Sequence, residues 1–161
     1  MEKLKRQDRL AILLVGNQNS GKTTTLKHFC NSYRVQQAEV FKQGWRFDII
    51  PFANKYFGVK IVAYFLPSSR TEKATPLETV FDSLEWYPDF LFIAEQLNGA
   101  EYQNTIRTLR ENDYHIKEFI LDSTNCDTIW HYYDEKDEEL FLNYRTEAMG
   151  EYVRRFILER I

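Results

Sequence analysis

The sequence predicts an α/β protein whose mostly parallel sheet carries helices on both faces. The first observation is the run Leu10–Val15, which is apolar throughout, as in a strand buried on both faces of a parallel sheet. The second is that strand-like runs then alternate with stretches in which apolar residues recur every three or four positions, the spacing of a helix packed on a sheet. Right-handed crossovers between such units would place the first strand inside the sheet.

The elements are expected in the order strand, helix, two strands, and then helices and strands in alternation. Residues 39–66 are rich in strand formers and are broken at residues 53–55, which predicts an antiparallel hairpin. Residues 67–75 are expected to form a polar loop, and Thr75 is expected to cap the helix that follows it. The remaining elements are predicted as a strand at 90–94, a helix near 102–109, a strand at 115–121 and a long helix at 138–159.

Length and composition fit one folded domain over residues 1–161, with residues 1–8 expected to be flexible. The chain has 161 residues, of which 43% are hydrophobic, and a formal net charge of −3. It can therefore bury a core, and it offers no dense basic surface for nucleic acid. No run approaches the ~20 apolar residues that cross a bilayer, so no membrane partner is expected. The two cysteines, Cys30 and Cys126, are isolated, which favours reduced thiols in a cytoplasmic protein.

The strongest functional signal is the stretch Gly-Asn-Gln-Asn-Ser-Gly-Lys-Thr at residues 16–23, directly after the first apolar run. Backbone N–H groups of such a loop surround phosphate oxygens, and the dipole of the next helix adds positive potential. Lys22 would reach the β- and γ-phosphates, and the Thr23 hydroxyl would coordinate Mg²⁺. We expect nucleotide contacts from every residue of the loop and from the residue after it: Gly16, Asn17, Gln18, Asn19, Ser20, Gly21, Lys22, Thr23 and Thr24.

A carboxylate that assists Mg²⁺ binding is expected at the carboxyl end of a strand beside the first one. Glu95 follows the apolar run at 90–94 and fits this description best. Asp122 follows the run at 119–121 and is the second candidate. Each of them could instead cap a loop or the next helix, and both readings stay open.

The strand ending at Leu66 is expected on the other side of the first strand, and no acid follows it. If that strand is the neighbour that carries the metal site, Ser68 or Ser69 would bind the γ-phosphate region, and Mg²⁺ binding and hydrolysis would be weak. Arg70, in the same loop, is a candidate for stabilising charge on a transferred phosphate.

The 16–23 motif, with its strand and helix, is the Walker A pattern and resembles the P-loop NTPase superfamily. That resemblance implies a three-layer fold that binds ATP or GTP with Mg²⁺. The predicted hairpin is similar to that of Ras-type GTPases, although their D-x-x-G position here reads Pro-Ser-Ser-Arg at 67–70. Their guanine-reading N-K-x-D element has only a degenerate counterpart at 124–127, which favours ATP over GTP. The strand at 89–95 is similar to that of molybdopterin-guanine dinucleotide accessory proteins, with Gln96 in place of their glycine.

Three functions are compatible with these residues. The first is a slow NTPase that acts as a nucleotide-dependent switch or accessory protein, read by a protein partner. The second is a small-molecule kinase that transfers the γ-phosphate. The third is a module that binds nucleotide and hydrolyses almost none. The kinase would draw its base and its charges from Asp48, Arg70, Arg107 and Arg110, although a solvated helix face is the preferred interpretation of the last two.

Overall fold

The computed structural model describes residues 9–17, 21–33, 39–41, 44–48, 62–84, 87–121 and 135–159. Its strands are β1 (Arg9–Gly16), β2 (Glu39–Phe41), β3 (Gly44–Asp48), β4 (Val62–Leu66), β5 (Phe90–Gln96) and β6 (Tyr114–Ile120). Its helices are α1 (Lys22–Tyr33), α3 (Arg70–Lys73), α4 (Leu77–Ser83), α5 (Tyr102–Glu111) and α6 (Glu135–Leu158). The predictions made for residues 1–8, Gln18, Asn19, Ser20, Asp122 and 124–127 lie outside the described residues.

The described strands form one sheet in the order β2-β3-β4-β5-β1-β6. Strands β4, β5, β1 and β6 are parallel, whereas β3 runs antiparallel to both β4 and β2. The mostly parallel sheet, its antiparallel addition and the interior place of β1 are thus confirmed. The predicted hairpin is seen in the β3–β4 pairing, although β4 is shorter than the predicted run.

The strand order corrects the expectation that the strand ending at Leu66 lies beside β1. Strand β5 lies between β4 and β1, and β6 occupies the other side of β1. Five consecutive residues of β5, Phe90 to Ala94, have no exposed surface, as expected of a central strand covered on both faces. Residues Ala63 to Leu66 of β4 are equally buried, so both strands are interior, and β4 is covered at its other edge by β3. The apolar character of a strand therefore predicts that it is buried and not which strand lies next to it.

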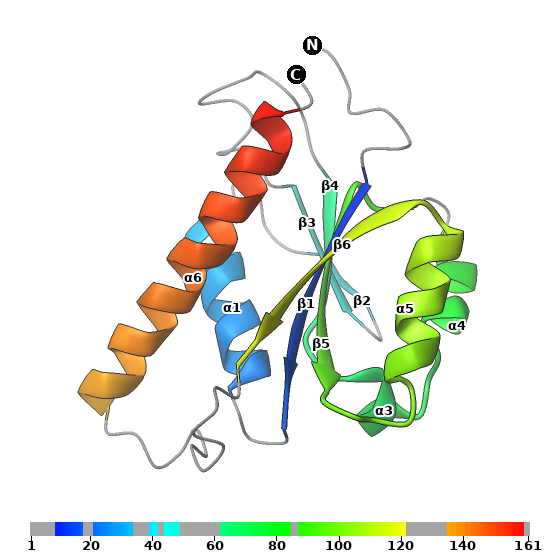
Figure 1. Ribbon diagram of the computed structural model, residues 1–161, viewed down its shortest axis with the longest axis horizontal. Coiled ribbons are helices and arrows are strands. Elements are labelled where there is room, and N and C mark those ends of the chain that lie inside the picture. Colours follow the sequence, from blue (N-terminus) through cyan, green and yellow to red (C-terminus); the bar gives the residue numbers. More distant parts are fainter. Residues whose placement is uncertain are drawn as a thin grey trace.

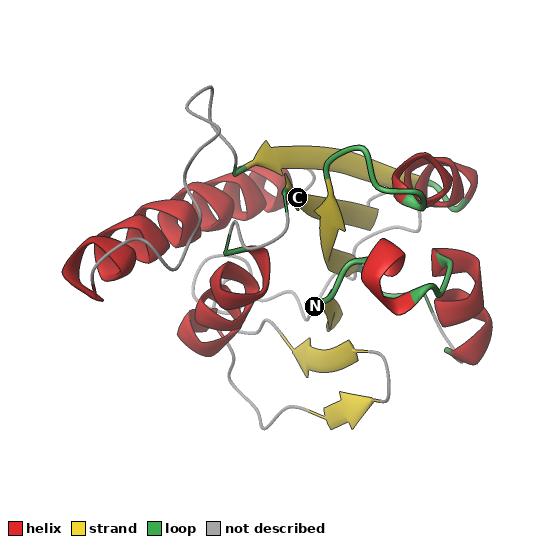
Figure 2. Cartoon of the chain, turned by 90° about the horizontal axis from the view of Figure 1, so that it is seen from below, coloured by secondary structure: helices red, strands yellow, loops and turns green. Residues whose placement is uncertain are grey.

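Two helix layers enclose the sheet (Figure 1), and Figure 2 shows the strands between the two groups of helices. Because side chains alternate along a strand, Ile12 and Leu14 of β1 pack with α1 and α6, whereas Leu13 and Val15 pack with α4 and α5. Aromatic rings join the layers: that of Phe92 lies 4.5 Å from that of Phe65 and 5.0 Å from that of Phe29 in α1. The predicted helices on both faces are confirmed.

The predicted loop at 67–75 contains the short helix α3, which is a correction. Thr75 does not cap α4, because its hydroxyl donates to the carbonyl of Lys73. The N-cap is Pro76, which has no side chain able to bond the helix. A positive φ of 48° at Ala74 ends α3 and turns the chain toward α4. Within the described part of the chain, none of the helices combines the length and apolar character that a membrane crossing requires.

Candidate functional site

The 16–23 loop connects the carboxyl end of β1 to the first turn of α1, at the lower edge of the sheet in Figure 1. Gly16 pairs in register with Gln96 of β5, and its carbonyl accepts a hydrogen bond of 3.1 Å from the N–H of Leu97. Gly21, immediately before α1, has a φ of 86°. An L side chain is strained at this angle, so the glycine of the motif is required by the backbone.

Lys22 folds back over the beginning of the loop. Its ammonium donates to the carbonyl of Gly16 at 3.0 Å and to the carbonyl of Asn17 at 2.7 Å, and the residue is only 6% exposed. A lysine in the first turn of a helix would ordinarily extend its charge into water. Here the positive charge is held against the loop that precedes the helix, where an anion bound by the loop would meet it.

Thr23 connects α1 to the end of β4. Its hydroxyl donates to the carbonyl of Pro67, with an O···O distance of 2.6 Å. A hydroxyl has one proton and two lone pairs. Because the proton is directed at Pro67, the oxygen presents its lone pairs elsewhere, which is the arrangement required of a metal ligand. From the sequence, Ser68 or Ser69 was expected to bind the γ-phosphate region if this strand carried the metal site, and the role of the Pro67 carbonyl was not predicted.

Glu95 lies in a different environment from Thr23. Its carboxylate has no exposed surface and accepts hydrogen bonds from the Thr105 hydroxyl at 2.9 Å and the Arg70 N–H at 3.4 Å. Glu95 pairs with Val15, whose side chain belongs to the α4 and α5 layer. The carboxylate therefore faces α5, on the side of the sheet opposite α1. Thr23 belongs to α1, so the structure does not bring the Glu95 and Thr23 side chains together.

Arg70 is also enclosed rather than presented at the surface of the site. It has no exposed surface, and its guanidinium donates to the carbonyl of Ser68 at 3.0 Å. Its backbone N–H, at the start of α3, is the group that contacts Glu95. The structure thus brings Arg70 and Glu95 together. The sequence had predicted separate roles for them, with Arg70 near the transferred phosphate and Glu95 near the metal ion.

Burial shifts the pKa values of both groups in this pair. Removal from water raises the pKa of the Glu95 carboxyl, and the hydrogen bonds and charge supplied by Thr105 and Arg70 lower it only in part. Burial likewise lowers the pKa of Arg70, opposed by its attraction to Glu95. Within the described residues, Oε2 of Glu95 has no hydrogen-bond partner. The cluster ties the segment after β4 to the end of β5 and to α5.

A contact from α6 to α1 was not predicted. Arg145 of α6 donates to the Thr25 hydroxyl at 3.2 Å, and Thr25 is fully buried in the first turn of α1. One turn further along α1, Nδ1 of His28 lies 2.8 Å from the Thr146 hydroxyl. Nothing in the sequence pattern distinguishes Arg145 from the other arginines of α6, so only the structure could identify it.

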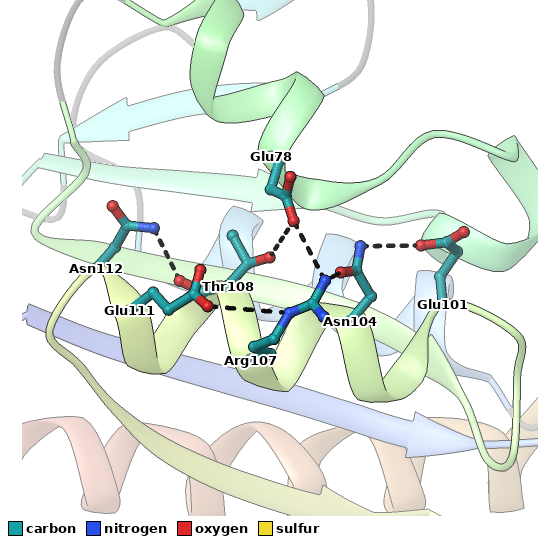
Figure 3. A network of polar contacts seen from close by, with 7 residues as sticks. All are labelled: Glu78, Glu101, Asn104, Arg107, Thr108, Glu111 and Asn112. Atoms are coloured by element: carbon teal, nitrogen blue, oxygen red, sulfur yellow. Dashed lines mark hydrogen bonds and ion pairs between the residues drawn. The ribbon is translucent and has the colours of Figure 1, made fainter.

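Arg107 belongs to a surface network on α5 that Figure 3 shows. Its guanidinium hydrogen-bonds Asn104 and lies 3.6 Å from Oε1 of Glu78 and 4.0 Å from Oε1 of Glu111. The side chain is 64% exposed. The solvated helix face preferred from the sequence is therefore what the structure has at Arg107.

The described residues contain no group of three or more His, Cys, Asp or Glu side chains that could hold a metal ion. Of the predicted metal ligands, Thr23 and Glu95 are placed by the structure in different environments, while Asp122 lies outside the described part of the chain. No protein-family model, curated protein or solved structure matches this chain, so relatives assign it to no family.

Proposed function

We propose that this chain is a P-loop NTPase domain that binds a nucleoside triphosphate through the 16–23 loop and hydrolyses it slowly. The observation that carries the proposal is the position of Lys22. Its ammonium, 3.0 Å from the Gly16 carbonyl and 2.7 Å from that of Asn17, lies across the loop whose backbone would surround the phosphates. A phosphate oxygen is a stronger acceptor for an ammonium than a neutral carbonyl is. The phosphates of a bound triphosphate would therefore accept hydrogen bonds that the Lys22 ammonium here donates to the loop carbonyls.

The chemistry of Thr23 fits a Mg²⁺ ion that accompanies the triphosphate. Its oxygen retains lone pairs because its proton is donated to Pro67. Mg²⁺ bound there would neutralise charge on the phosphates. The group that accepts the Thr23 proton is a neutral carbonyl and not a carboxylate, so it adds little to the attraction for a divalent cation. We infer that Mg²⁺ assists binding modestly and that turnover is slow.

The switch interpretation is supported by the segment that Thr23 contacts. Residues Pro67 to Arg70 are held at one end by Thr23 and at the other by Glu95, so a change at Thr23 is transmitted to α3. A protein partner that binds such a segment would distinguish the nucleotide-bound form of the chain from the free form. The kinase alternative gains nothing from Arg107, because Glu78, Asn104 and Glu111 hold it on the solvent face of α5.

The test is calorimetric titration of ATP and of GTP, each with Mg²⁺, into the wild type, Lys22→Ala and Lys27→Ala. Loss of a charge-assisted contact of roughly 1.5–3 kcal/mol lowers the affinity of Lys22→Ala by about 10- to 150-fold. Lys27 is an exposed lysine on the same helix, and its removal should leave the affinity within about twofold. A loss of less than about threefold in Lys22→Ala would show that the loop is not the phosphate site.

A further inference from the structure

Strand β6 has an open edge. Within the described residues, β1 is the only strand that pairs with it, so β6 ends the sheet. The pairing runs through seven consecutive residues without a bulge, and neither proline nor glycine interrupts the strand. A regular edge strand presents a row of backbone N–H and C=O groups to which a further strand can bond. The edge of β6 is therefore able to accept one more strand.

The direction of the backbone groups shows which of them are available. The N–H of Leu121, directly after β6, donates to the carbonyl of Val15 in β1 at 2.9 Å. Successive residues of a strand direct their backbone groups to opposite edges. Odd-numbered residues of β6 therefore direct theirs to β1, whereas Ile116, Glu118 and Ile120 direct theirs away from the sheet.

A pocket of about 290 Å³ lies beside this edge. Its lining joins the start of β6 to the last turns of α6 and consists of His115, Ile116, Tyr152, Arg155, Phe156 and Glu159. The α6 residues follow the spacing of three and four that defines one face of a helix. Because the backbone of Ile116 points away from the sheet, the pocket lies where the side chain of an added strand would enter it.

The β6 side chains that face α6 indicate what an added strand should carry. His115 and Phe119 are in ring contact with Phe156 and Tyr152 of α6. Between them in the strand, the ammonium of Lys117 lies 5.3 Å from the centre of the Tyr152 ring. Among the described residues, no carboxylate forms an ion pair with Lys117. Opposite charges on facing residues of neighbouring strands attract, so the residue opposite Lys117 should be acidic.

We propose that the edge of β6 binds an extended segment of another protein as an additional strand, with an acidic residue opposite Lys117 and an apolar side chain in the pocket. In this mode of recognition, backbone hydrogen bonds supply affinity and alternate side chains supply specificity. The surface is separate from the proposed nucleotide site. His115 pairs with Leu10 at the start of β1, whereas the 16–23 loop follows the end of that strand.

A second copy of this chain fits the edge less well than a single strand does. Ring contacts hold α6 against one face of β6. Two copies paired through β6 would place their α6 helices over strands that are about 4.8 Å apart. Packed helices need about 8–10 Å between their axes. A strand that carries no such helix avoids this conflict.

The experiment is an NMR titration of the isotope-labelled full chain with two synthetic peptides. Each has the order threonine, leucine, threonine, a central charged residue, threonine, leucine, threonine, which reads the same in both strand directions. The central residue is glutamate in one peptide and lysine in the other. At up to about 5 mM, the glutamate peptide should slow hydrogen exchange at the N–H groups of Ile116, Glu118 and Ile120. The lysine peptide should bind about 2- to 30-fold more weakly.

Two variants test the charge. Lys117→Glu should reverse the preference, so that the lysine peptide binds more tightly than the glutamate peptide. Lys27→Glu changes an exposed lysine of α1 and should leave the wild-type preference unchanged. A reversed preference in Lys117→Glu alone supports the proposal, because the overall change in net charge is the same in both variants.

Other outcomes would overturn the proposal. One is that neither peptide affects the N–H groups of β6 in the wild type. Another is that both peptides bind equally, or that protection appears at N–H groups outside this edge. Sedimentation of the wild type without peptide covers the remaining occupant: a dimer that protects the same three N–H groups would assign the edge to a second copy.

Discussion

The Thr23 hydroxyl and the Pro67 carbonyl are joined by a hydrogen bond of 2.6 Å, although their elements are not neighbours in the sheet. Thr23 follows the loop after β1, whereas Pro67 follows β4, and β5 lies between these two strands. The bond therefore spans the carboxyl edge of the sheet. The segment before α3 is therefore part of the candidate site. Its contact is made by a backbone carbonyl, which a sequence motif made of side chains does not predict.

Replacing Thr23 by Val keeps the shape of the side chain and removes its hydroxyl. We expect Thr23→Val to lose the gain in ATP affinity that Mg²⁺ gives the wild type, since the metal would lose its protein ligand. The lost bond to Pro67 should also lower the free energy of unfolding by about 0.5–1.5 kcal/mol. ATP titrations with and without Mg²⁺, together with urea unfolding, measure both effects. Thr23→Ser retains a hydroxyl and is the control; an undiminished Mg²⁺ effect in Thr23→Val would contradict the assignment.

The pair formed by Arg70 and Glu95 should show strong energetic coupling. Both residues are fully buried, and the attraction between the guanidinium and the carboxyl raises the pKa of Arg70 and lowers that of Glu95, against the effect of burial. We expect Arg70→Met and Glu95→Leu each to lower the free energy of unfolding by about 1–3 kcal/mol, because each leaves a buried polar partner without that attraction. The double variant should cost clearly less than the sum of the single ones, because no uncompensated charge remains. Urea unfolding of the four proteins gives the coupling, and additive costs would show that the two charges do not interact.

Glu95 should also make the stability of the fold depend on pH. Its ordinary pKa is 4.5, and burial raises the pKa in the folded chain. The folded chain therefore holds this proton to a higher pH than the unfolded chain does, and stability is lost as pH rises through that interval. Relative to Glu95→Gln, the wild type should lose stability from about pH 4.5 upward and then level off. Urea unfolding of both proteins from pH 4 to 8 measures the difference; a wild type that gains stability over this range relative to Glu95→Gln would contradict the cause.

Much of the fold could be predicted because local patterns determine it. The apolar run of β1, the helical spacing of α1 and α5 and the run of β5 identify buried elements, and the structure confirms them. The order of the strands was only partly accessible. Both β4 and β5 are buried, so their apolar runs do not tell which of them pairs with β1; that choice depends on the packing of the whole sheet.

The candidate site, like the fold, could be predicted from the sequence only in part. The motif at 16–23 identifies Lys22 and Thr23, because chemistry and spacing coincide in one segment. Glu95 was predicted as a strand-end acid, but the face toward which it points depends on its pairing with Val15. The contacts from Pro67 and Arg145 join segments that are far apart in the sequence. Such contacts leave no local pattern, and only the packed structure reveals them.

Gly99 lies in the loop after β5, where this loop packs closely against Thr71 of α3. A Cβ at this position would lie 2.5 Å from the Thr71 hydroxyl oxygen and 3.1 Å from the carbonyl oxygen of Gln96. Thr71 has little freedom to move, because it is β-branched and its hydroxyl accepts a hydrogen bond from the N–H of Glu101. We expect Gly99→Ala to lower the free energy of unfolding by about 1–3 kcal/mol, as overpacked sites do. Thr71→Ala should add less to that cost in the Gly99→Ala background than in the wild type, because it removes the atom that clashes. Urea unfolding of the single and double variants measures this, and a Gly99→Ala protein as stable as the wild type would show that the loop yields without cost.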